Sequence, residues 1–147
     1  MMADKELTTD ELLLLLFKES DPARFFEQNE SAFLTMSFGE YLSNWCTLHR
    51  EIPGHIIRAA NLDKSYGHQL FNDKRNPSRD TVLQLAFAMG ADYKQTQEML
   101  CIAQKSQLYP RIKRDAAIIF CINNHKSLTD AQILLQELKL PLIGGRE

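Results

Sequence analysis

The sequence predicts an all-α protein, and three observations support that prediction. Apolar residues recur three and four positions apart through most of the 147 residues. No stretch of strand length alternates apolar and polar residues between turn signals. Capping residues such as Ser37 and Asp92 precede several of these segments, with Glu or Gln three positions later. The length corresponds to one domain with extensions, and an apolar fraction of 44% is enough for a buried core.

The N-terminal segment, residues 1–37, is predicted to be an acidic helical extension. Thr8 or Thr9 can cap its first helix, since two acids follow in the opening turn. That helix contains the run Leu12–Phe17, which is apolar on every side. Pro22 begins a second short helix. We expect the apolar run to pack against the C-terminal helices of the chain, with self-association as the second interpretation.

Five helices are expected between residues 38 and 104. The second and third are short and are separated by a tight turn at Asn61 and Leu62. A loop of turn formers and bases follows at residues 72–77, and Gly90 closes the fourth helix. The expected starts of the five helices are marked by Ser37, Pro53, Asp63, Ser78 and Asp92.

Residues 105–147 predict a pair of helices that packs on the preceding domain. Pro110 is expected to start the first helix, and Ser127 or Thr129 can cap the second. Three bases, Arg111, Lys113 and Arg114, stand at the start of the first helix, where they oppose the helix dipole. We therefore expect these bases to contact an anionic partner, either a DNA backbone or the acidic segment of the same chain. A solvated face is the alternative.

The charge of the chain is unevenly distributed. The formal net charge of −2 divides into −5 for residues 1–37, zero for residues 38–92 and +3 for residues 93–147. An acidic arm on a mildly basic body is compatible with nucleic-acid binding. The neutral middle segment would need dimerisation or the C-terminal bases to bind a nucleic acid tightly.

Several classes of protein are disfavoured by composition. The longest apolar run, Leu12–Phe17, is far shorter than the roughly 20 residues of a membrane-spanning helix. Acids stand where a signal peptide would carry bases. Three cysteines without a spaced framework indicate reduced thiols. We therefore expect a cytoplasmic protein without a membrane partner.

Catalytic and metal sites are also not expected. The Cys46-x-x-His49 pair, even with His55, falls short of the four ligands that zinc needs, so Cys46, Cys101 and Cys121 are interpreted as core residues. The sequence has no Gly-rich phosphate loop, His-Glu-x-x-His or Gly-x-Ser-x-Gly motif. We expect neither an enzyme nor a bound cofactor.

The segment from Pro53 to Phe71 has the size and spacing of a helix-turn-helix, whose second helix can enter a major groove about 12 Å wide. Residues 61–77, NLDKSYGHQLFNDKRNP, resemble the motif of the phage-repressor-like (Cro/CI, Xre-type) helix-turn-helix family. In that family a short polar recognition helix is followed by a loop similar to Lys74-Arg75-Asn76-Pro77 and then by a helix rich in Leu and Ala. The resemblance covers residues 38–92. It implies a five-helix lambda-repressor-like DNA-binding domain at residues 38–104, with N- and C-terminal helical extensions, in a bacterial transcriptional regulator.

The resemblance also implies individual roles. Gln69 can pair with adenine and Lys64 can reach guanine or phosphate. The residues expected to face bases are Lys64, Ser65, Tyr66, His68 and Gln69, and those expected to hold the DNA backbone are Lys74, Arg75, Asn76 and Arg79. The expected core residues are Leu62, Leu70, Val82, Leu85 and Ala86.

Two residues depart from the family pattern. Gly67 stands where the family has a branched apolar residue, so we expect a packing gap and a cost of about 1 kcal/mol for glycine inside a helix. Asp73 stands where the loop usually has Gly, so we expect a left-handed backbone and a negative charge close to the DNA phosphates.

Three functions follow from these observations. The first is sequence-specific binding of double-stranded DNA by a transcriptional regulator that reads the major groove with residues 64–71, with a homodimer as a further expectation because such regulators read two half-sites. The second is a protein-interaction module that keeps the fold and binds DNA weakly or not at all. The third is a regulator with a small-molecule sensor in residues 93–147.

Overall fold

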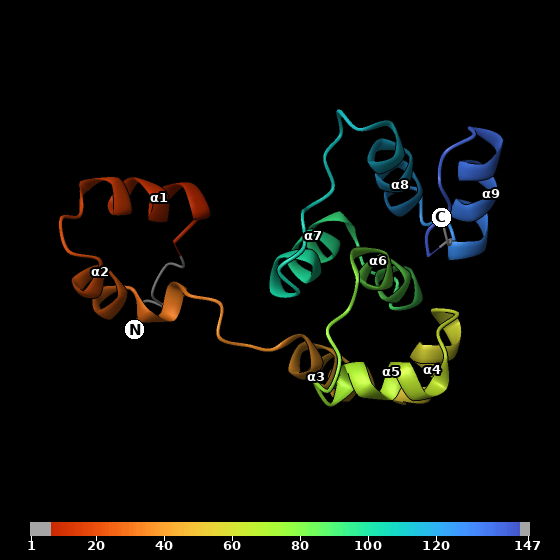
Figure 1. The fold of residues 1–147 in the computed structure, drawn as a ribbon, viewed down its shortest axis with the longest axis horizontal. Coiled ribbons are helices and arrows are strands. Elements are labelled where there is room, and N and C mark those ends of the chain that lie inside the picture. The colour runs from red at the N-terminus through yellow and green to blue at the C-terminus, as the bar shows by residue number, and fades with distance from the viewer. Residues whose placement is uncertain (1–6, 145–147) are drawn as a thin grey trace. The chain divides into compact units, whose positions relative to one another are not determined.

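A computed structural model describes residues 7–144 of the chain. Within them it contains nine α-helices, one short 3-10 helix and no strand, which confirms the all-α prediction (Figure 1). The chain divides into two compact units, unit 1 at residues 1–35 and unit 2 at residues 36–147. In the described part, no helix has the length and apolar character needed to cross a bilayer.

Unit 1 contains α1 (Thr9–Lys18), α2 (Pro22–Gln28) and the 3-10 helix η1 (Glu30–Ala32). Thr8 caps α1 through a capping box, in which its hydroxyl accepts from the Glu11 N–H at 3.1 Å and Glu11 accepts from the Thr8 N–H at 3.4 Å. The expected start of this helix is thus confirmed.

Aromatic contacts hold α2 and the 3-10 helix together. Phe25 is buried and packs edge-to-face against Phe26 and Phe33, with ring centroids 6.4 and 5.9 Å away. None of the residues of α1 is buried. The described part of unit 1 therefore has a very small apolar core.

Unit 2 contains seven helices, from α3 to α9, in its described part. They are α3 (Phe38–His49), α4 (Pro53–Ala59), α5 (Lys64–Phe71), α6 (Arg79–Ala88), α7 (Tyr93–Ile102), α8 (Lys113–Asn123) and α9 (Leu128–Glu137). The caps expected from the sequence are confirmed, because the side chains of Ser37, Asp63, Ser78, Asp92 and Ser127 each accept a backbone N–H in the first turn of the helix that follows.

The helices α4 to α9 all end in the same way, with a left-handed residue two positions after the last helical one. Only Gly90, after α6, is a glycine. The others are Asn61, Asp73, Gln104, His125 and Lys139. The sequence indicated the ends at Asn61, Asp73 and Gly90, whereas Gln104 and Lys139 gave no such signal because their side chains are unusual in this conformation.

Helix α6 is the centre of unit 2 and contacts α4, α7 and α9 (Figure 1). Six consecutive residues, Thr81–Ala86, are buried, so neighbours cover this helix on every side. Gln84 donates to the carbonyl of Ala60 at 3.0 Å and ties α6 to the end of α4. Four of the predicted core residues, Leu70, Val82, Leu85 and Ala86, are buried, and Leu62 is half-buried.

The C-terminal helices share one core with the preceding five. Ile118 of α8, Leu135 of α9 and Ile143 belong to the same apolar cluster as Leu83. Gln132 donates to the carbonyl of Ile143 at 2.7 Å and accepts from its N–H at 2.8 Å, which holds the last described residues against α9.

The expected start of α8 at Pro110 was wrong, because the helix begins at Lys113. Ile112 has an extended backbone and its N–H donates to the carbonyl of Tyr109, which closes a turn before the helix. The N–H of Tyr109 donates to the carboxylate of Asp115 at 2.9 Å. This tertiary contact holds Pro110 in the turn.

Candidate nucleic-acid interface

Helices α4 and α5 are joined by a turn that reverses the chain within three residues. Asn61 adopts the left-handed conformation with φ 58°, and its N–H donates to the carbonyl of Arg58 at 2.9 Å. The N–H of Leu62 donates to the carbonyl of Ile57 at 3.1 Å. These two bonds form a Schellman motif, which ends α4 and directs the chain to the Asp63 cap of α5.

Gly67 is where α5 lies closest to α4, and the packing gap expected there was wrong. A Cβ atom at Gly67 would lie 2.4 to 2.9 Å from three side-chain carbons of Ile57. Ile57, which is 2% exposed, therefore fills the space that a side chain on α5 would need. The missing side chain allows the helix pair to approach closely, and glycine is required here for packing.

Most of the predicted base-contact residues lie on an exposed polar face of α5. Lys64, Ser65 and His68 are exposed, and Gln69 is half-buried. The side-chain hydrogen bonds around α5 are made by Asp63, Tyr66 and Asn72. The four polar side chains thus have donors and acceptors available for a ligand.

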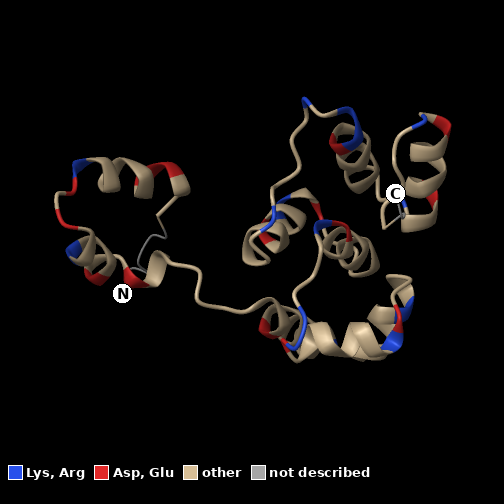
Figure 2. Ribbon diagram, viewed as in Figure 1, with Lys and Arg blue, Asp and Glu red and all other residues tan. Residues whose placement is uncertain are grey.

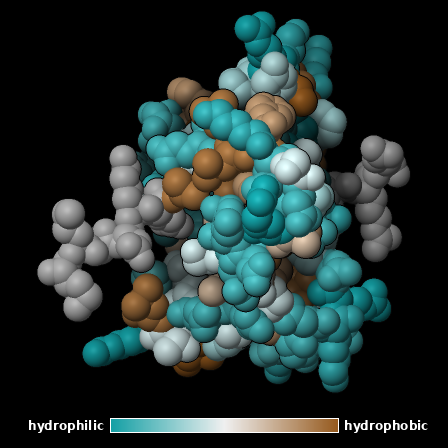
Figure 3. Space-filling view, turned by 90° about the vertical axis from the view of Figure 1, so that its left-hand side faces the viewer, coloured by the Kyte–Doolittle hydropathy of each residue, from teal (hydrophilic) through white to brown (hydrophobic). Residues whose placement is uncertain are grey.

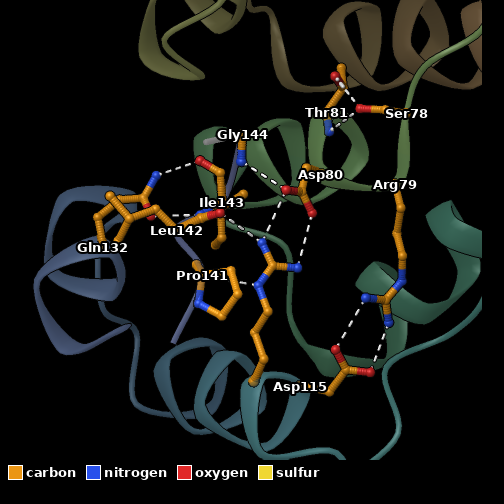
Figure 4. A network of polar contacts seen from close by, with 11 residues as sticks. Ser78, Arg79, Asp80, Thr81, Asp115, Gln132, Pro141, Leu142, Ile143 and Gly144 are labelled. Atoms are coloured by element: carbon orange, nitrogen blue, oxygen red, sulfur yellow. Dashed lines mark hydrogen bonds and ion pairs between the residues drawn. The ribbon is translucent and has the colours of Figure 1, made fainter. Parts of the chain in front are cut away.

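Tyr66 differs from these four residues. It is half-buried and packs against the core cluster, and its hydroxyl lies 3.3 Å from the hydroxyl of Thr81. The Thr81 N–H donates to the Ser78 hydroxyl that caps α6 (Figure 4), so Tyr66 contacts the first turn of that helix. The structure therefore gives the Tyr66 side chain a role in joining α5 to α6.

The loop after α5 presents Lys74, Arg75 and Asn76 as exposed side chains. Asp73 has φ 61°, which confirms the left-handed conformation expected at this position. Its carboxylate accepts from the Ser37 hydroxyl at 2.7 Å and from the Gly39 N–H at 2.9 Å.

The charge of Asp73 is therefore directed at the N-terminus of α3, where the helix dipole favours an anion. A Cβ at Gly39 would lie 2.6 Å from both the Asp73 carboxylate and the Phe71 carbonyl. Glycine is needed at this position because the loop packs directly on the start of α3.

Arg79 was expected to hold the DNA backbone, but the structure gives it partners within the protein. Its guanidinium donates to both carboxylate oxygens of Asp115, at 3.1 and 2.8 Å (Figure 4). It also donates to the carbonyls of Ser106 and Gln107, at 2.9 and 3.0 Å. Asp115 is 1% exposed. We therefore leave Arg79 out of the candidate interface, because binding a phosphate would require Arg79 to leave a buried carboxylate.

Arg114 of α8 forms a second arginine–aspartate pair between α8 and α6. Its guanidinium donates to both carboxylate oxygens of Asp80, at 3.1 and 3.0 Å, and to the carbonyls of Pro141 and Leu142 (Figure 4). The Gly144 N–H also donates to Asp80, at 2.8 Å. The anionic partner expected for Arg114 was a DNA backbone or the acidic N-terminal segment, and the structure instead pairs Arg114 with Asp80 of α6.

The pKa of Asp80 reflects these contacts. Burial works against ionisation, but the bonds from Arg114 and Gly144 and the charges of Arg114 and Arg79 outweigh it, so the pKa is lowered below its ordinary value. Asp80 is therefore a structural carboxylate of the α6–α8 connection.

Two residues that were not predicted as DNA contacts lie on α4, the first helix of the pair. His55 and Arg58 are exposed on α4. With Lys64 they border a pocket of about 360 Å³ at the helix-turn-helix. The helical spacing of residues 55 and 58 places them on one side of α4, and this spacing was the available sequence signal.

Basic side chains lie at both ends of α5. Lys64 begins this helix beside Arg58 of α4, and Lys74 and Arg75 follow its last turn (Figure 2). The exposed polar face lies between these two groups. Such a surface can bind a polyanion whose charges lie on both sides of a readable groove.

The Cys46–His49 pair does not assemble a metal centre in the part of the chain that the structure covers, where no group of three possible ligands occurs. Cys46 is buried, and burial raises the pKa of its thiol. The Nδ1 atom of His49 lies 3.0 Å from the Trp45 carbonyl, and its ring stacks on Trp45. Cys121 is buried and Cys101 half-buried.

No family model matches the chain, and comparisons with curated proteins and with solved structures find no similar protein.

Proposed function

We propose that unit 2 is a sequence-specific DNA-binding domain of the lambda-repressor-like type and that the protein regulates transcription. In this proposal α3 to α7 form the five-helix domain, α5 enters the major groove, and α8 and α9 are a C-terminal extension of its core. The observation that carries the proposal is the exposed polar face of α5, with Lys64, Ser65, His68 and Gln69, between two groups of basic residues.

The dimensions of α5 support the proposal. A helix of eight residues is about 12 Å long, and the major groove is about 12 Å wide. Lys64 and Ser65 lie in the first turn of α5, which is the part that contacts base edges in helix-turn-helix proteins, and His68 follows on the same face. Lys74, Arg75 and Asn76 would then contact the phosphates on one side, and Arg58 and His55 those on the other.

The acids and the bases of the neutral middle segment differ in their availability for a ligand. Residues 38–92 carry six acids and six bases. Four of the acids, Asp63, Asp73, Asp80 and Asp92, accept hydrogen bonds at helix N-termini or from Arg114. These acids therefore have partners within the protein, whereas the bases next to α5, Arg58, Lys64, Lys74 and Arg75, are exposed.

The test is selection of bound duplexes from a random pool, followed by titration of the selected site at several salt concentrations. Gln69→Ala should reduce discrimination at one base pair by about 1–3 kcal/mol. Arg75→Ala should weaken binding to every sequence and reduce the salt slope by about one. Gln136→Ala and Lys126→Ala, exposed residues elsewhere in unit 2, are the matched controls.

The absence of any duplex binding at low ionic strength would overturn the proposal and favour a protein-interaction module with the same fold. Binding that Gln69→Ala and Arg75→Ala leave unchanged would overturn the assignment of α5 as the reading helix.

A further inference from the structure

Helix α1 presents apolar side chains to solvent all around its axis. Five consecutive residues, Leu13–Phe17, are each at least 44% exposed, and Phe17 is 73% exposed. Consecutive helical residues differ in direction by about 100°, so five of them point to every side. Apolar side chains also interrupt the hydrophilic surface in the space-filling view (Figure 3).

The described part of unit 1 cannot cover these side chains by itself. Phe25 is the buried residue of α2, and α1 and η1 have none. Phe26 and Leu34 add further exposed apolar area at 54% and 68% exposure. Helices as short as α1 are marginal in water unless an apolar face is packed, so unit 1 gains stability when another surface covers α1.

The shape of this apolar surface favours a groove as its complement. A flat partner would cover one side of α1 and leave the residues on the opposite side in water. A groove covers a helix on several sides, as in the helix-in-groove mode of recognition.

The charge of unit 1 indicates which kind of residue would border such a groove on a partner. Residues 7–35 carry six acids and two bases. One of the bases, Arg24, is already paired with Glu19 at 2.6 Å, and this bond lowers the pKa of Glu19. Asp10 and Glu11 lie at the start of α1, and Glu27 and Glu30 lie near Phe26. A nucleic acid or an anionic membrane would be repelled, whereas a rim of Lys and Arg would be attracted.

We propose that unit 1 is a docking module that inserts α1 into an apolar groove, rimmed by Lys and Arg, on a partner protein. This interaction is separate from the proposed DNA binding, which uses residues of unit 2. It gives the protein a second surface through which a DNA-bound copy can recruit another protein.

The probe is a labelled synthetic helical hairpin with a Leu-lined groove edged by Lys, compared with the same hairpin edged by Glu. The full chain is titrated into each and fluorescence anisotropy is measured. We expect the Lys hairpin to bind at least about tenfold more tightly, with affinity falling as salt rises.

Leu14→Asp and Phe17→Asp should each weaken binding to the Lys hairpin by about tenfold or more, because an acid replaces an apolar contact. These variants keep the fold, since both side chains are exposed, and circular dichroism checks this. Leu48→Asp is the matched control, because Leu48 is 79% exposed on α3 of unit 2 and should leave the affinity unchanged.

Equal binding to both hairpins, no binding to either, or no effect of Leu14→Asp would overturn the proposal. Sedimentation velocity and vesicle binding test whether a second copy of the chain or a lipid surface covers α1 instead. Self-association that Leu14→Asp abolishes would identify a second copy of the chain instead. Binding to phosphatidylcholine vesicles that depends on Leu14 would identify a lipid surface.

Discussion

Units 1 and 2 use the same local signals to form helices and differ in what their helices bury. The Thr8 cap of α1 and the Asp92 cap of α7 are both complete capping boxes. Yet α1 has no buried residue, whereas α7 buries Thr96, Met99 and Leu100. Capping thus marks the starts of helices in both units, whereas burial of side chains gives unit 2 an extended core and the described part of unit 1 a very small one.

The ion pairs of the two units differ in the same way. Arg24 and Glu19 of unit 1 form a pair within a short stretch of sequence, in which the Arg24 side chain is 55% exposed and the Glu19 side chain 13%. Arg79 and Asp115 of unit 2 are separated by 36 residues, and the carboxylate is almost fully buried. The second pair connects α6 to α8, so it contributes to the tertiary structure, whereas the first stabilises only a local turn.

The largest effect should come from removing the buried carboxylate of unit 2. Asp115→Ala leaves the Arg79 guanidinium and the Tyr109 N–H without their acceptor. Loss of one partner of a buried pair is expected to reduce the free energy of unfolding by about 3–5 kcal/mol. Urea unfolding measures this loss of stability. The control is Glu19→Ala in unit 1, which should leave the unfolding midpoint unchanged. Equal effects of the two variants would contradict the comparison.

A smaller effect is expected from truncating leucines in the two units. Leu83 is fully buried in α6. Changing it to Ala should reduce the free energy of unfolding of the protein by about 2–5 kcal/mol. Leu14→Ala in α1 should change stability by less than about 0.5 kcal/mol, because its side chain is exposed. A large loss for Leu14→Ala in thermal unfolding of the isolated chain would show that α1 is already covered.

Gly67 provides an intermediate test of packing within unit 2. Gly67→Ala should destabilise the protein by about 1–3 kcal/mol, because the new methyl group would overlap Ile57. Gly54→Ala on α4 is the control, since no atom lies within 4 Å of a Cβ there. The double variant Gly67→Ala/Ile57→Ala should lose less stability than the sum of the two single variants, as measured by a double-mutant cycle. Additive losses would show that the two residues do not oppose each other.

The smallest effect should be on the pH dependence of stability. The folded pKa of Asp80 is lowered from 3.8, so the contribution of its ionised form is complete above that value. This contribution to stability is lost as the pH falls from the pKa of the unfolded state through the lower pKa of the folded state. Acid unfolding of Asp80→Asn should therefore depend less on pH below about pH 4 than that of the native sequence. The control is Glu19→Gln, which should leave the pH profile of stability unchanged because water screens the pair of Glu19 and Arg24. An equal change in both variants would remove the distinction between the units.

The sequence by itself determined the helices and most of their starts. Ser, Thr and Asp caps place backbone acceptors at defined positions, and apolar spacing identifies the helix stripes, so both signals act within a few residues. The candidate residues of α5 and the loop of Lys74 and Arg75 were instead identified from the resemblance of residues 61–77 to the helix-turn-helix motif. The start of α8 was missed, because the Tyr109–Asp115 bond that delays it depends on local three-dimensional geometry.

Only the tertiary structure decided which polar residues remain available for a ligand. Arg75 and Arg79 look alike in the sequence, but Arg79 lies opposite the buried Asp115 and Arg75 lies in an exposed loop. Gly67 looked like a defect until Ile57 was seen to fill its place. Both contacts depend on which helices pack together. The contacting residues lie far apart in the chain or on different helices. Local sequence patterns carry no such information.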